Sequence, residues 1–168
     1  MTAGIEQDEE VGLAERIRER LGTHARLREL CDRLEAMADD LPDRPCPLES
    51  RKLVAELTAL LHRQEDDSLL RLLLEGREGP GMHQALAARI RSQHVTDLVH
   101  AQDLESALLE AREGDMQALG YMLRCFFLGC RRALAFEELA ILHLADGATP
   151  ELDCAIGAAI APRDGRMD

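Results

Sequence analysis

Ionisable side chains interrupt the apolar stripe of each long helical segment in this sequence. They are His24, His62 with Asp66, His94 and Glu137. Burying several such groups costs on the order of 1 kcal/mol or more each, unless they pair with one another or bind a metal ion. Imidazoles and carboxylates that project from facing helices into a bundle core form the metal sites of di-iron proteins. The spacing therefore indicates a metal site, with a metal-free polar cluster as the alternative.

Four helical segments would have to position these residues. Apolar residues recur at helical spacing over residues 11–41, 47–75, 82–112 and 116–145. The segment 42–47 holds three prolines, and Gly79-Pro80-Gly81 and Glu113-Gly114-Asp115 provide the other two breaks. Short connections between long helices predict an all-α, up-down-up-down four-helix bundle.

The predicted bundle is a single domain over residues 1–168, with flexible ends at 1–10 and 162–168. A further short helix is expected within 149–161. The fourth long helix has a 4-3-4-3 seam made of Leu119, Leu123, Phe126, Cys130, Ala133, Glu137, Ala140 and Leu144. The second has a predicted inward face made of Ala55, Ala59, His62, Asp66, Leu69 and Leu73.

Composition excludes several classes of protein. The 168 residues carry 20 Lys and Arg against 32 Asp and Glu, a net charge of −12, which argues against binding nucleic acid or an anionic membrane. Aromatic residues are 2%, so an all-β fold is not expected. The five cysteines form no CxxC pair, and the first ten residues are acidic. We therefore expect a cytoplasmic protein without a disulfide framework.

Four stretches of the chain resemble the hemerythrin-like (HHE cation-binding) family. They are THARLRELCDRLEAMA at 23–38, HRQEDDSLL at 62–70, SQHVTDLVHAQDLESAL at 92–108 and RRALAFEELAILHLA at 131–145. The tail ELDCAIGAAIAPRDG is also similar to the closing segment of proteobacterial members. The resemblance covers nearly the whole chain, and the spacing of the stretches is more specific than any one of them.

The resemblance implies a centre in which histidines hold two irons and two carboxylates bridge them. The positions that match its ligands are His24, His62, Asp66, His94 and Glu137. Ala133 stands where the family has a histidine on the fourth helix, so the half-site of His24 and His62 is implied to survive better than the other. Cys130 and Asp97 are the candidate replacement ligands.

The implied function is a non-haem metal-binding protein with a partly degenerate site. Iron, as one or two ions, is the expected cofactor, with zinc or manganese held less selectively. Such a protein would bind O2 or NO, sense redox state or handle metal, and a homodimer is compatible with it. The alternative is a metal-free bundle that acts as a structural or protein-interaction module. Catalysis is not expected, because the sequence holds no nucleophile-and-base arrangement and no phosphate-binding loop.

Overall fold

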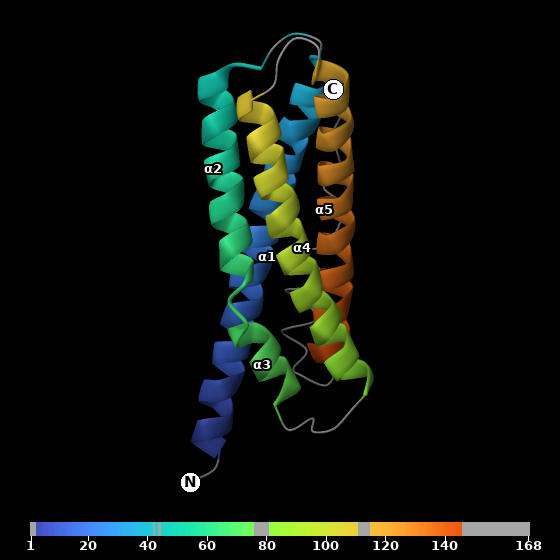
Figure 1. The fold of residues 1–168 in the computed structure, drawn as a ribbon. Coiled ribbons are helices and arrows are strands. Elements are labelled where there is room, and N and C mark those ends of the chain that lie inside the picture. The colour runs from blue at the N-terminus through green and yellow to red at the C-terminus, as the bar shows by residue number, and fades with distance from the viewer. Residues whose placement is uncertain (1–2, 42, 44, 76–80, 111–114, 146–168) are drawn as a thin grey trace, which may run out of the picture.

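The computed structural model in Figure 1 describes residues 3–41, 43, 45–75, 81–110 and 115–145. Its helices are α1 (Ala3–Asp39), α2 (Pro47–Gln64), α3 (Ser68–Leu74), α4 (Met82–Glu110) and α5 (Met116–Ala145). These residues include no strand, so the predicted all-α class is confirmed. Of the helices described, none is long and apolar enough to cross a membrane.

The four long helices lie side by side, and successive ones run in opposite directions (Figure 1). α1 contacts α2 and α5, and α4 contacts the same two helices from the other side. The short α3 packs against α1, α4 and α5. This arrangement places one face of every long helix toward a common core.

Most helix boundaries agree with the sequence prediction. α2 begins with Pro47 in its first turn and has Glu49 close behind, where a negative charge favours the helix N-terminus. α5 has the predicted bounds. α1 begins at Ala3, inside the segment expected to be flexible, and continues without interruption past Gly22. The predicted short helix over 149–161 and the tail 162–168 lie outside the described residues.

The prediction of one helix over 47–75 is wrong, because α2 ends at Gln64 and α3 begins at Ser68. Arg20 of α1 donates to the backbone oxygen of Gln64 at 3.0 Å and to that of Asp66 at 2.7 Å. The Asp66 carboxylate accepts from the backbone N–H of Ser68 at 2.9 Å, as Asp often does in turns. These bonds stabilise a break that apolar periodicity cannot reveal, since buried leucines occur on both sides of it.

The predicted inward face of α2 is also wrong. Ala55, Ala59 and His62 are exposed. The buried residues of α2 are Ser50, Leu53, Val54, Leu57, Leu60, Leu61 and Gln64. The helix therefore presents its leucine-rich side to the bundle, which removes more apolar surface from water than the alanine side would.

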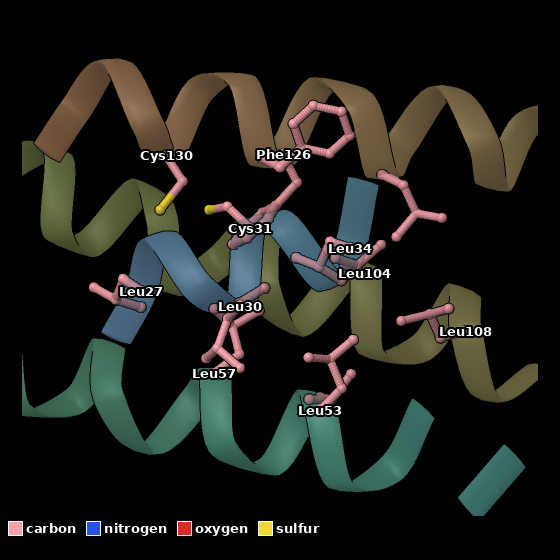
Figure 2. Close-up of a cluster of buried hydrophobic side chains, with 14 of the residues drawn as sticks. Leu27, Leu30, Cys31, Leu34, Leu53, Leu57, Leu104, Leu108, Phe126 and Cys130 are labelled. Carbon is pink, nitrogen blue, oxygen red and sulfur yellow. The ribbon is translucent and has the colours of Figure 1, made fainter. Parts of the chain in front are cut away.

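The core consists of two apolar clusters. The larger one fills the half of the bundle that contains the start of α2, and Figure 2 shows part of it, with Leu30, Leu34 and Leu57 among its members. The smaller one contains Ile17 and Ile141 and includes the leucines of α3. In α1, α4 and α5, buried polar residues lie in the sequence between the positions that belong to the two clusters.

Candidate functional site

A buried polar layer separates the two apolar clusters. Its side chains are at most 7% exposed, and they are Arg20, His24, Gln64, His94, Asp97, Glu137 and Glu138. α1, α2, α4 and α5 each contribute at least one of them. So many ionisable groups at one level of a core must pair with one another or with a ligand.

Glu137 is the centre of this layer. Its Oε2 accepts from Nε2 of His94 at 2.7 Å and lies 3.5 Å from Nε2 of His24. Its Oε1 accepts from the Arg20 guanidinium at 3.2 Å. One carboxylate thus joins α1 and α4 to α5.

His24 is the most deeply buried member, with no exposed surface. Its Nδ1 lies 3.1 Å from Oε1 of Glu138, and the other oxygen of Glu138 accepts from Arg28 at 2.7 Å. The 3.5 Å approach of its Nε2 to Glu137 is long for a hydrogen bond, and this nitrogen has no hydrogen-bond partner among the described residues. The ring therefore keeps one donor or acceptor atom available inside the core.

Electrostatic pairing decides the charge of the layer. Burial acts to raise the pKa of Glu137, but the close approach of His24 and the hydrogen bond from His94 outweigh it and hold that pKa well below its usual range. Burial acts to lower the pKa of His24, and its contacts with Glu137 and Glu138 reverse the effect and raise that pKa above 6.5. The metal-free layer therefore favours two carboxylates with an imidazolium between them.

This arrangement predicts a loss of stability at high pH in the metal-free protein. The raised pKa of His24 gives a stabilisation that is complete below pH 6.5, the ordinary histidine pKa in an unfolded chain. This stabilisation is lost as the pH rises through the folded pKa. The free energy of unfolding should fall by at most about 1.4 kcal/mol per pH unit in that window. Urea unfolding between pH 6 and pH 9 would measure it. The same slope in His24→Gln would contradict the assignment to His24.

The structure does not bring His62 and Asp66 to this layer. The His62 side chain is 53% exposed and pairs with Glu65 at 3.0 Å on the outside of α2. Asp66 is exposed in the break between α2 and α3, so the two residues do not share a helix face. Of the five sequence-predicted ligands, the structure places His24, His94 and Glu137 together.

Ala133, at which the resemblance implies a histidine, lines a small cavity. Ala133 is partly exposed, and the cavity beside it has a volume of about 10 Å³, the space of a single water molecule. His94, Asp97 and Glu137 line the same cavity. Burial raises the pKa of Asp97, which accepts a hydrogen bond from Gln93 at 2.8 Å. Residue 133 is therefore adjacent to the layer without contributing a polar atom to it.

Cys130, the other suggested replacement ligand, belongs to the larger apolar cluster. Its thiol faces that of Cys31 on α1 (Figure 2). The hydrogen bond with Cys31, together with burial, raises the pKa of Cys130, which keeps its thiol protonated. The residue lies about two helical turns before Glu137, so it packs as a small apolar side chain.

Sequence reasoning missed Arg20, Glu138 and Gln64. Arg20 precedes His24 by one helical turn on the same face, which is a signal that the sequence contained. Arginine is almost never fully buried unless it is paired, so such a position is normally assigned to the surface. Glu138 carried no signal, because it is next to the seam residue Glu137 rather than in the seam.

The donor atoms of the layer partly fit the metal centre that the resemblance implies. Two imidazoles and one carboxylate are donors typical of a non-haem iron site, and His24 has a free buried nitrogen. A pair of ions does not fit, because His62 and Asp66 are elsewhere and Ala133 has no donor atom. In the described ranges, no three His, Cys, Asp or Glu side chains are already arranged around a common point as metal ligands.

Comparisons with known proteins add no further assignment. The chain matches no protein-family model, no curated protein and no solved structure. Functional inference therefore depends on the polar layer and on the four sequence stretches that resemble hemerythrin-like proteins.

Proposed function

We propose that this protein is a hemerythrin-like helical bundle that binds one divalent transition-metal ion through His24, His94 and Glu137. The observation that carries the proposal is the convergence of two imidazole Nε2 atoms on one carboxylate oxygen, at 2.7 and 3.5 Å, inside the core. The free Nε2 of His24 supports it, because an unsatisfied buried polar atom is costly without a ligand. A single ion replaces the implied pair.

Iron in its ferrous state is the expected ion, with zinc or manganese held less selectively. A ferrous ion with few protein ligands supplies open coordination positions for a small diatomic ligand such as O2 or NO. The chain's own residues orient the site. Glu138 contacts the Nδ1 of His24 at 3.1 Å, and a carboxylate at that position fixes the tautomer and direction of a ligating ring.

A second candidate is a metal-free bundle that acts as an interaction module. The contact of Arg20 with Glu137 at 3.2 Å favours it, because a guanidinium can neutralise the carboxylate without any ion. Arg28 does the same for Glu138 at 2.7 Å. In this case the polar layer is a set of structural ion pairs, and function depends on the surface.

Metal content separates the two candidates. The protein is purified without metal-affinity resin, loaded anaerobically with Fe(II), and analysed by elemental mass spectrometry. We expect about one ion per chain in the wild type and less than about one fifth of that in His24→Gln and His94→Gln, because each loses a direct ligand. Metal-free protein titrated with Co(II) gives a second readout, because the ligand-field bands of the aqueous ion shift and change in intensity when imidazole and carboxylate ligands bind it.

The matched control is His62→Ala, which removes an exposed imidazole that the resemblance implies to be a ligand. It should keep the wild-type iron content. Loss of iron in His62→Ala would contradict the three-residue site, and two ions per chain would restore the implied pair. A wild type that stays folded with no bound iron or cobalt would favour the metal-free candidate.

A further inference from the structure

A cavity of about 400 Å³ lies between α1 and the junction of α2 with α3. This volume falls in the range of small-molecule sites. Its walls include Gly22 and Thr23 of α1 and the apolar side chain of Leu69 on α3. It is distinct from the small cavity at Ala133, and Arg20 is the side chain that it shares with the buried polar layer.

Positive charge dominates the lining of this cavity. The cationic side chains are Arg16, Arg20, Arg26 and Arg63, whereas the acidic ones are Glu19 and Asp66. The charge of this lining is thus opposite in sign to the net charge of the chain, which is −12. A concave surface lined by one sign of charge attracts ligands of the opposite sign.

Both acidic side chains in the lining are already engaged. Glu19 pairs with Arg16 at 3.4 Å. Asp66 accepts the backbone N–H of Ser68 at 2.9 Å. The pKa of Asp66 is lowered first by that bond with Ser68, and the positive charges of Arg16 and Arg20 lower it further. Neither carboxylate forms an ion pair with Arg26 or Arg63, so the four arginines leave the lining with a net positive charge.

Arg26 and Arg63 are the uncompensated cations. Both are exposed and come from different helices, α1 and α2. In the part of the chain that the structure describes, neither guanidinium group makes a hydrogen bond or an ion pair. Arg20, in the same lining, is held in place by its bonds to Gln64, Asp66 and Glu137. The cavity lining thus contains two unpaired guanidinium groups and one that is fixed by hydrogen bonds.

We propose that this cavity binds a small organic anion of the phosphate monoester class, with its phosphate between Arg26 and Arg63. Guanidinium groups bind phosphate oxygens through paired, charge-assisted hydrogen bonds. The apolar part of the ligand packs against Leu69, which lines the same space. None of the three proposed metal ligands lines the cavity, so the proposed anion site does not require the metal ion.

Isothermal titration calorimetry with phenyl phosphate tests this site in the full chain, with a chelator present to exclude metal binding. Benzyl alcohol serves as the uncharged comparison. Arg26→Gln and Arg63→Gln should each weaken phenyl phosphate binding about tenfold, since a hydrogen bond to a charged group contributes that much. Added salt should weaken binding in the wild type, and benzyl alcohol should bind much more weakly than phenyl phosphate.

Arg51→Gln is the matched control. Arg51 is also exposed, and its guanidinium group makes no hydrogen bond or ion pair among the described residues. It lies in the first turns of α2, whereas the cavity is at the other end of that helix. The Arg51→Gln variant should bind phenyl phosphate with the same affinity as the wild type. The proposal is overturned if phenyl phosphate does not bind at about 1 mM, or if the double variant Arg26→Gln with Arg63→Gln binds it unchanged. Circular dichroism of each variant verifies that the helices remain intact.

Discussion

Replacing Glu137 by glutamine should lower the free energy of unfolding of the metal-free protein by about 3–5 kcal/mol. Glutamine has nearly the same volume, so the change removes charge without creating a cavity. Arg20, 7% exposed, would then lack its carboxylate partner, and His24 would keep only Glu138. A buried cation without a counter-charge is among the most destabilising features of a core.

Glu56→Gln is the control for this measurement. Glu56 pairs with Arg33 at 2.9 Å between α2 and α1, and both side chains are at least half exposed. Its loss should cost less than about 1 kcal/mol, because solvent screens exposed pairs. Urea unfolding followed by circular dichroism near neutral pH measures both variants. A Glu137→Gln protein within about 1 kcal/mol of the wild type would show that Arg20 and His24 are stabilised by other groups.

The fold could be predicted from the sequence to a large extent because helix periodicity and breakers are local signals. The seam of α5 from Leu119 to Leu144 and the prolines before α2 were sufficient to define those helices. The break at Glu65 could not be predicted in this way. It depends on Arg20, which is more than forty residues earlier in the chain and donates to the carbonyls that the break exposes.

The candidate site was predicted only in part, for a related reason. His24, His94 and Glu137 each interrupt an apolar stripe that is unambiguous, and all three are buried together. α2 has two stripes that could face inward, one rich in leucine and one containing His62. The prediction placed the stripe with His62 inward because it contains an ionisable residue, and this was wrong. The stripe with Leu57 and Leu61 has the larger apolar area, and burying that area determines which side of α2 faces the core.

Replacing Ala133 by histidine should strengthen metal binding about 100-fold. Residue 133 lies one helical turn before Glu137 and lines the cavity shared with His94 and Asp97. An imidazole there would add a nitrogen donor beside His94 and Glu137, which line the same cavity. Loss of a partner that only orients a ligand typically changes metal affinity by about 10–100-fold, so a direct ligand should have an effect at the upper end of that range or beyond it.

Co(II) titration of Ala133→His against the wild type measures the gain, and elemental analysis after Fe(II) loading shows whether a second ion enters. Ala133→Phe is the steric control, because it adds a ring of similar size without a nitrogen atom. The cavity of about 10 Å³ is smaller than either ring, so both variants should displace neighbouring side chains to a similar extent. A gain in Ala133→His alone would therefore come from coordination. Equal affinities in Ala133→His, Ala133→Phe and the wild type would contradict this expectation, because they would mean that a bound ion does not come within reach of residue 133.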